Sequence, residues 1–371
     1  MTAAALVGLV LLLAVTAYSC GGGTDYGAGL WDLTAGNSER GARPRALIDY
    51  AMAPVWEVNN VWLVFVLVVT WTGFPGVFAA VFSAAWISLT FAVLGLILRG
   101  VGFAFRKPTR HLARRRRYSA VFGVASLLTP FFFAATLGGI ASGRVPLGSR
   151  DSTLVTTWLN PTSVVFGAVS LAAAAFIGAV FLVGDAHRFG APELADYFKL
   201  RAVLAGAAFL VLGGVALLVL RSDAAYVFGG MWHGWGLPFT LAAPVLAVVT
   251  AVLVSLGTQR LTRVVTRLTA IGAVGSAVFA WGVAQRPYLL PTTLTVEQGA
   301  SSAPTLHWLV IVAVVALVLV TPPLLLLYRL DIGGALEADH DQDLSRTADE
   351  APADDSPADD SSADATPPKD T

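Results

Sequence analysis

Long apolar runs, separated by short polar connections, dominate the pattern of this chain. Nine of them are long enough to cross a membrane as helices: about 2–30, 49–71, 76–104, 118–142, 161–184, 197–220, 235–257, 263–285 and 305–329. A helix needs about 20 predominantly apolar residues to cross the hydrocarbon core of a bilayer. The pattern therefore predicts an all-α polytopic membrane protein with about nine transmembrane helices.

The first apolar run ends in Ala17-Tyr18-Ser19-Cys20, which has the outline of a lipoprotein signal peptide. No Lys or Arg precedes the run, and Ala17 with Tyr18 suits a cleavage site poorly. We therefore expect this segment to remain as a spanning helix. Cys20 is the single cysteine of the chain, which excludes an internal disulfide, a multi-cysteine zinc site and a cysteine-ligated iron–sulfur cluster.

Composition supports the membrane assignment, since 56% of the residues are hydrophobic and only 13% are charged. The net charge of zero is the sum of two opposite regions, +11 for residues 1–330 and −11 for residues 331–371. The second region is rich in Asp, Ala, Ser and Pro and has no apolar periodicity, so we expect a disordered acidic tail. The predicted domains are a membrane domain at 1–330 and this tail at 331–371.

Basic residues are distributed unevenly among the connections. Sixteen Lys or Arg lie in or beside the connections after the first, third, fifth and seventh segments, and only four lie at the other connections. Because basic loops stay in the cytoplasm, this predicts an N-terminus outside and a C-terminus inside the cell. We interpret the densest cluster, from Arg106 to Arg117, as a topology anchor that also touches anionic lipid, rather than as a nucleic-acid patch.

A few ionisable residues lie inside the predicted spans, where charges are costly and mark functional candidates. At 1.5 Å per residue, Asp25 lies about 8 Å and Glu57 about 12 Å from the cytoplasmic ends of their predicted helices, and Arg99 about as close as Asp25. All three are therefore predicted in the inner half of the membrane. This arrangement favours a proton or ion entrance from the cytoplasm and, equally, a buried structural ion pair of Asp25 or Glu57 with Arg99.

The neighbours of the two acids add polarity and space that packing does not require. Gly21–Gly23 remove side-chain bulk near Asp25, which permits close backbone approach or included water. Asn59 and Asn60 place two amides within one helical turn of Glu57. No glycine loop for phosphate and no His-Glu-x-x-His motif is present, and the five histidines are isolated, so we predict no metal site.

Several stretches resemble the second subunit of the cytochrome bd quinol oxidases, which use ubiquinol or menaquinol. They are Thr-Asp-Tyr-Gly-Ala-Gly at 24–29, Pro-Val-Trp-Glu-Val-Asn-Asn-Val-Trp-Leu at 54–63, Leu-Arg-Gly-Val-Gly-Phe at 98–103, and a block between 287 and 306. The resemblance covers residues 1–330 and is most specific in the first hundred. The chain departs from the family at Glu57-Val58, where some members have Asp-Gly, and at the missing first acid of the helix 1 motif, which marks a divergent branch.

The resemblance implies a heterodimer with a first subunit that carries haems b and d, oxidises quinol and reduces oxygen to water. For this chain it implies two four-helix bundles plus one peripheral helix in the bacterial plasma (inner) membrane, with no bound haem and no catalytic residue of its own. It implies a proton path through Asp25 and Glu57, with supporting groups at Trp56, Asn59, Asn60 and Arg99. A quinone bound by this chain, membrane lipids as partners and a small accessory subunit stay open, and no nucleic acid is expected.

Two other interpretations remain. In an ion-coupled secondary transporter, Asp25 and Glu57 would bind the coupling ion. Such transporters usually have helices broken near the midplane in repeated halves, whereas the glycine run at 21–23 is off-centre and has no counterpart in the second half of the chain. In a purely structural membrane subunit, the acids would only pair with Arg99.

Overall fold

The structure, a computed structural model, describes residues 2–36, 41–106, 112–148, 154–256 and 260–332. Within these ranges some side chains lie outside the description, namely those of residues 50, 52–58, 106, 112–116, 260–262, 320, 321, 323–325 and 327–332. Residues Met1–Ile311 form one compact unit, and Val312–Thr371 are grouped separately. The predicted acidic tail at 331–371 lies almost wholly outside the described residues.

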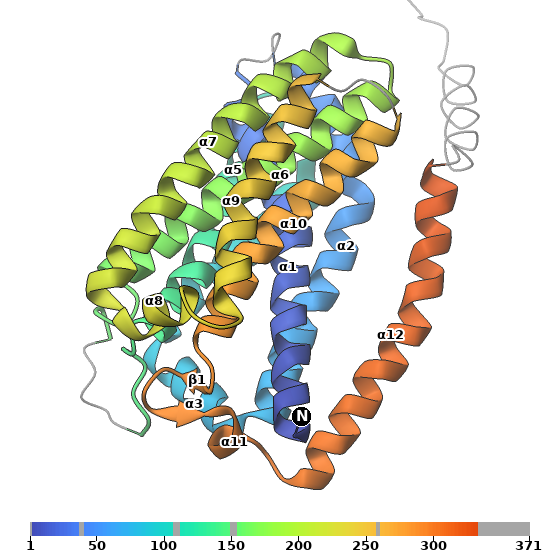
Figure 1. Ribbon diagram of the computed structural model, residues 1–371. Helices are drawn as coiled ribbons and strands as arrows, with labels where there is room; N and C mark the ends of the chain where they lie inside the picture. Colours follow the sequence, from blue (N-terminus) through green and yellow to red (C-terminus); the bar gives the residue numbers. More distant parts are fainter. Residues whose placement is uncertain (1, 37–40, 107–111, 149–153, 257–259, 333–371) are drawn as a thin grey trace, which may run out of the picture. The chain divides into compact units, whose positions relative to one another are not determined.

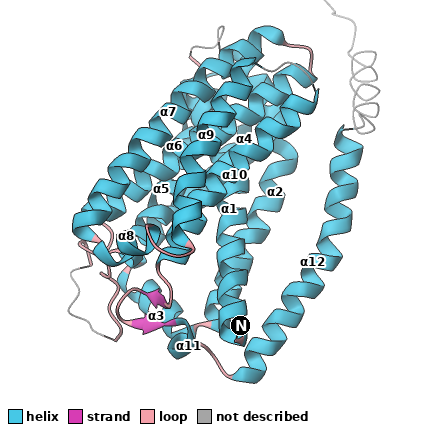
Figure 2. Cartoon of the chain, in the orientation of Figure 1, coloured by secondary structure: helices cyan, strands magenta, loops and turns pink. Residues whose placement is uncertain are grey.

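The described chain is helical apart from one short hairpin (Figures 1 and 2). The helices are α1 (Ala3–Thr34), α2 (Ala42–Gly73), α3 (Pro75–Ala84), α4 (Trp86–Arg106), α5 (Leu112–Ala141), α6 (Pro161–Arg188), α7 (Pro192–Asp223), α8 (Ala225–Met231), α9 (Gly236–Leu256), α10 (Arg260–Ala284), α11 (Val296–Gly299) and α12 (Ala303–Ile332). The antiparallel strands β1 (Tyr288–Leu290) and β2 (Leu294–Thr295) precede α11.

The predicted spans all have counterparts. Among the described residues, seven helices are long and apolar enough to cross a membrane, an eighth span is reached if a bent pair of helices counts as one, and Ala303–Leu319 forms a shorter apolar helix. The protein is therefore a polytopic, multi-pass helical membrane protein, as predicted. Helix α8 and the β1–β2 hairpin were not predicted, because each is too short to produce a hydropathy signal.

The third predicted span, 76–104, is wrong as a single helix. It is interrupted at Ala85, and its first part, α3, is bent by 116° from the Asn59–Gly73 part of α2. Pro75 occupies the first turn of α3, where a proline fits well because its missing N–H would have no partner there. Buried Phe74 lies at the bend, and the spanning part is Trp86–Phe105.

The first two helices are longer than predicted. Helix α1 continues to Thr34 instead of residue 30, and α2 begins at Ala42 instead of residue 49. Asp25 is therefore nine residues, or about 14 Å, from the end of its helix, and Glu57 is fifteen residues, or about 22 Å, from the start of α2. Both acids lie deeper relative to the helix ends than the sequence indicated.

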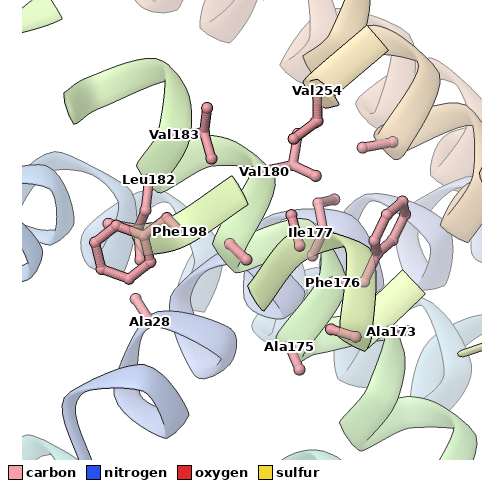
Figure 3. Packing of buried hydrophobic residues seen from close by; sticks show 14 of the residues in the cluster. Ala28, Ala173, Ala175, Phe176, Ile177, Val180, Leu182, Val183, Phe198 and Val254 are labelled. Carbon is pink, nitrogen blue, oxygen red and sulfur yellow. The ribbon is translucent and has the colours of Figure 1, made fainter. Parts of the chain in front are cut away.

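The helices of the first unit pack in two groups. In the first group, α4 packs on α5, α5 on α1 and α1 on α2. Helices α6, α7, α9 and α10 form the second group, and α1 and α5 also pack on α6. Figure 3 shows small buried residues of α6, such as Ala173 and Ala175, in the same hydrophobic cluster as Ala28 of α1. A side chain at Gly27 would overlap the carbonyl of Ala174, so glycine lets the α1 and α6 backbones meet.

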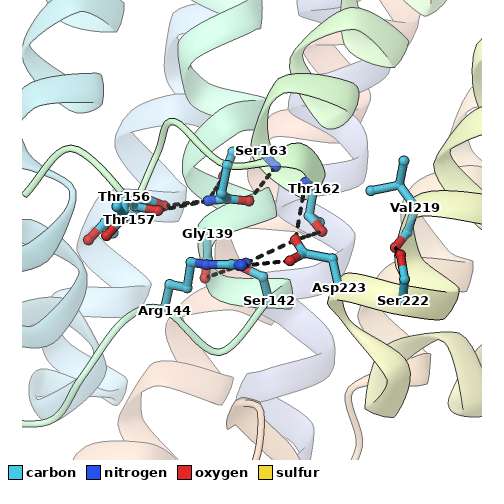
Figure 4. A network of polar contacts seen from close by, with 11 residues as sticks. Gly139, Ser142, Arg144, Thr156, Thr157, Thr162, Ser163, Val219, Ser222 and Asp223 are labelled. Atoms are coloured by element: carbon cyan, nitrogen blue, oxygen red, sulfur yellow. Dashed lines mark hydrogen bonds and ion pairs between the residues drawn. The ribbon is translucent and has the colours of Figure 1, made fainter. Parts of the chain in front are cut away.

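A polar cluster joins α6 and α7 at the end of the bundle where α6 begins (Figure 4). The carboxylate of Asp223, the last residue of α7, accepts bonds of 2.9 and 2.6 Å from both terminal nitrogens of Arg144. It also accepts from the hydroxyl of Thr162 at 2.6 Å. The carboxylate raises the pKa of the Arg144 guanidinium, chiefly through this side-chain hydrogen bonding. The cluster fixes the 141–161 connection to two helix ends.

Candidate functional site

Asp25 and Arg99 form a buried ion pair between α1 and α4. Their side chains are 2% and 1% exposed, and the Nη2 of Arg99 donates to both the carboxylate and the backbone carbonyl of Asp25. The structure thus brings together two of the predicted site residues, Asp25 and Arg99. A charge in this position requires such a partner, because an unpaired ion in an apolar interior is very costly.

Further contacts hold the Arg99 guanidinium in place. Its Nη1 donates to the hydroxyl of Ser126 on α5 at 3.2 Å. Its Cζ lies 4.8 Å from the centre of the Tyr26 ring and 4.6 Å from that of Phe122, so two aromatic faces cover the cation. The remaining nitrogen, Nε, is buried and has no hydrogen-bond partner among the described residues. This donor therefore has capacity for a further polar ligand.

The pair is linked to a large apolar cavity through two tyrosines. The hydroxyls of Tyr18 and Tyr26 lie 2.7 Å apart, and both side chains line a cavity of about 1080 Å³ within the first unit. Its walls are mainly aliphatic and aromatic, with contributions from Leu12, Phe133 and Phe209 among others. The polar groups at Asp25 and Arg99 thus lie one aromatic ring away from this space.

Asn59 on α2 packs against the glycine run of α1. A methyl group at Gly22 would lie 2.9 Å from Asn59 Nδ2, so the glycine allows the amide to approach the α1 backbone. Asn59 is 3% exposed, and its Oδ1 is buried without a hydrogen-bond partner among the described side chains. Asn59 is therefore buried beside the glycine run of α1, and its supporting role stays a prediction.

The register of α1 against α2 fixes the height of Glu57. The two helices run in opposite directions (Figure 1). Gly22 of α1 lies opposite Asn59 of α2. Asp25 is three residues further along α1, about 4.5 Å, and Glu57 is two residues back along α2, about 3 Å, in the same direction. The backbone at Glu57 therefore lies at nearly the height of Asp25.

The other predicted site residues are only partly described. The side chains of Trp56 and Glu57 lie outside the described residues, so only their places in α2 are known. Asn60 is half-buried on the same helix and takes part in a polar interaction. The side-chain contacts of Glu57 thus fall outside the described part of the chain, and its role stays a prediction.

Sequence reasoning missed an acid and the hydroxyl groups around the pair. Asp32 fell outside the predicted first helix, yet it lies within α1 with a side chain that is 0% exposed, 3.6 Å from Arg45. The signal was its spacing, since seven residues separate it from Asp25 and place both on one helix face. Ser126, Tyr18 and Tyr26 carried no such signal, because single hydroxyls in apolar spans commonly bond to the preceding turn.

Possible ligands for a haem or metal are scattered. No group of three or more His, Cys, Asp or Glu that could hold a metal ion occurs among the described residues. His187 lies in the last turn of α6, His233 follows α8 with its Nδ1 2.6 Å from the carbonyl of Gly229, and His307 lies on α12. His111 and His340 lie outside the described residues.

Comparison with known proteins identifies the family. The model for the family "Cytochrome bd terminal oxidase subunit II" matches residues 3–331. The chain belongs to this family. Among relatives, the cytochrome bd-I ubiquinol oxidase subunit 2 of Escherichia coli (strain K12) is 26% identical over 361 residues, which cover 87% of this chain and 90% of that protein. The cytochrome bd ubiquinol oxidase subunit 2 of Bacillus subtilis (strain 168) is 32% identical over 109 residues, 29% of this chain and 31% of that protein.

A solved structure supports the same fold. The structure of bd oxidase from Geobacillus thermodenitrificans superimposes with a TM-score of 0.72 at 23% identity and covers 89% of this chain and 98% of that chain. At this identity the likeness shows the fold. The resemblance found in the sequence motifs is therefore confirmed at the level of the family, and the subunit II fold positions Asp25, Asn59 and Arg99 as described.

Proposed function

We propose that this chain is the second subunit of a cytochrome bd-type quinol oxidase and is catalytic only together with a first subunit that carries the haems. The complex oxidises quinol and reduces oxygen to water in the bacterial plasma membrane. The match of the subunit II family model along residues 3–331 supports this role, and both relatives above are named as subunits of ubiquinol oxidases. In this division of labour, the present chain contributes structure and a path for protons.

The proposed proton path enters from the cytoplasm and uses Asp25 and Glu57. The observation that carries it is the coincidence of two acids at one height, one of them buried against Arg99. Two buried polar atoms beside them, Asn59 Oδ1 and Arg99 Nε, have no partner among the described residues. Buried polar atoms of this kind commonly bind ordered water, which conducts protons between titratable groups.

A purely structural ion pair explains Asp25 and Arg99 but gives no reason for Glu57. One carboxylate is enough to neutralise Arg99, and Asp25 supplies it. A second acid at the same height in an apolar span adds a cost that a structural pair does not require. Glu57 is therefore better explained by proton transfer than by neutralisation of Arg99.

An ion-coupled transporter also fits the structure poorly. The family membership does not favour that activity. Transporters place broken helices at the binding site, whereas the bend between α2 and α3 follows Gly73, sixteen residues or about 24 Å from Glu57. The break and the two acids thus belong to different levels of the bundle.

The large cavity is the place where a quinone or a lipid tail would fit in this chain. Its volume of about 1080 Å³ and its apolar walls suit an isoprenoid or acyl chain. The hydroxyls of Tyr18 and Tyr26 would provide hydrogen-bond partners for a polar head. Organic extraction of the purified complex, followed by mass spectrometry, identifies such an occupant, and its loss in a Tyr18→Phe, Tyr26→Phe variant would locate the head.

The proton path is tested at Glu57. In the assembled complex, Glu57→Gln should slow oxygen consumption by about 10²-fold, the typical contribution of a proton-transferring group, because glutamine cannot bind the proton. Glu57→Asp should retain part of the activity. Glu193→Gln is the control, since Glu193 forms an exposed ion pair with Arg43. Normal turnover of Glu57→Gln at every pH, with full haem content, would remove Glu57 from the path.

A further inference from the structure

A second buried acid lies on the same face of α1 as Asp25. Asp32 follows Asp25 by seven residues, so the two side chains differ by only about 20° around the helix and by about 10.5 Å along it. Asp32 is 1% exposed overall, as well buried as Asp25. Because it lies in the last turn of α1, a negative charge there is opposed by the helix dipole. The position therefore requires a compensating group.

Arg45 supplies the compensating positive charge, and its partly exposed side chain connects buried Asp32 with solvent. It belongs to the first turn of α2, and its Nε lies 3.6 Å from Asp32 Oδ1. Its Nη2 donates to the carbonyl of Gly36 at 2.6 Å, which ties the α1–α2 connection together. The Arg45 side chain is 22% exposed, whereas that of Asp32 is 0% exposed. Asp32 is thus a buried acid in contact with a group that reaches water.

Ser126 occupies the interval between the two acids. A side chain at Gly29, one turn beyond Asp25, would overlap the Ser126 hydroxyl, so this oxygen packs directly on the α1 backbone at that height. The same hydroxyl accepts from Arg99 Nη1 and donates to the carbonyl of Phe122 at 2.7 Å, while Nη2 of the same guanidinium donates to Asp25. From Gly29 to Asp32 the helix rises about 4.5 Å, and two successive hydrogen bonds through one water span about 5.5 Å. The proposed route therefore places one bridging water between Ser126 and Asp32.

We propose that Asp32 is the first acid of the proton route on the cytoplasmic side, beside Arg45, and that it passes protons through Ser126 to the Asp25–Arg99 pair. This proposal rests on the proposed function of Asp25. A proton from water binds the Asp32 carboxylate and leaves through the bridging water. The Ser126 hydroxyl accepts one proton, turns from the Phe122 carbonyl and releases its own proton toward Asp25. The Asp25 carboxylate beside the same guanidinium takes it up, and Asp32 returns to its anionic form. No electron is transferred in these steps.

The test compares variants of the complete two-subunit complex. Asp32→Asn should lower oxygen consumption per haem by roughly 10-fold, less than the 10²-fold or more expected for Asp25→Asn, because water beside Arg45 retains partial access to the inner acid. The solvent deuterium isotope effect on turnover should increase, since proton entry becomes rate-limiting. Asp32→Glu should restore most of the rate. A purely structural role predicts loss of assembled complex, with an unchanged isotope effect in the complex that remains.

Asp185→Asn is the matched control. Asp185 is a largely buried acid near the end of α6, paired with Arg267 at 2.5 Å, and it should keep normal turnover and isotope effect. If Asp32→Asn fails to assemble, Asp32→Asn, Arg45→Gln removes both charges together and should assemble but remain slow. Normal turnover of Asp32→Asn, or of Asp32→Asn, Arg45→Gln, with Asp25→Asn impaired, would overturn the role of Asp32 alone. Normal turnover of Asp25→Asn as well would overturn the proposed path.

Discussion

At the scale of single residues, Asp25 and Arg99 show what the sequence could and could not predict. Their presence in apolar spans marked both as candidates, and depth placed them near one another. Which acid pairs with Arg99 could not be predicted, because it depends on the rotation of α1 against α4. The rotation of α1 in the bundle depends on close packing at glycines such as Gly27, where α1 meets α6, and hydropathy alone does not encode it.

The ion pair leads to a prediction about stability. Arg99→Gln leaves the buried Asp25 carboxylate without its cation and should destabilise the complex by about 3–5 kcal/mol, the usual effect of breaking a buried pair. Asp25→Asn, Arg99→Gln removes both charges and should recover much of this loss. Arg43→Gln, which breaks an exposed pair with Glu193, should have little effect. Thermal unfolding of the purified complex measures all three, and equal losses in the three variants would contradict this description of the pair.

At the scale of helices, hydropathy predicted most of the fold because each spanning helix must satisfy its own backbone and present apolar side chains. It misplaced the ends of α1 and α2, since Asp32 and Arg45 continue the helices while compensating one another's charge. It also missed the bend at Phe74, where α3 remains apolar although it changes direction. Charged residues at helix ends and turns between apolar segments are set by tertiary contacts rather than by composition.

The orientation of the helices is tested with reporter fusions. Fusions after Arg110 and after Thr258 should report the cytoplasm, and fusions near Gly148 and Gly299 should report the outside, because basic residues concentrate at the first pair of connections. Alkaline phosphatase and a fluorescent protein provide opposite signals at each site. A reversed pattern would place Asp32, Asp25 and Glu57 on the outer side and remove the cytoplasmic entrance.

At the scale of the whole molecule, the chain is one subunit of a larger oxidase. The family match covers nearly the whole membrane region, and the solved bd oxidase shares its fold. The features of this chain are two groups of helices, an apolar cavity, and the acids Asp25 and Asp32 on one face of α1. In the proposed function, these features support the oxidation and reduction chemistry of a first subunit that binds haem.

The central claim is most directly tested by comparing the chain alone with the chain co-expressed with a haem-bearing first subunit. Haem requires strong axial ligands such as His, Met or Cys thiolate held in a dry pocket. We expect the purified chain alone to show no haem absorption band and no quinol-dependent oxygen consumption, and the co-expressed pair to show both. A stoichiometric haem band from the isolated chain would contradict the account, and His233 and His307 would then be the first residues to replace.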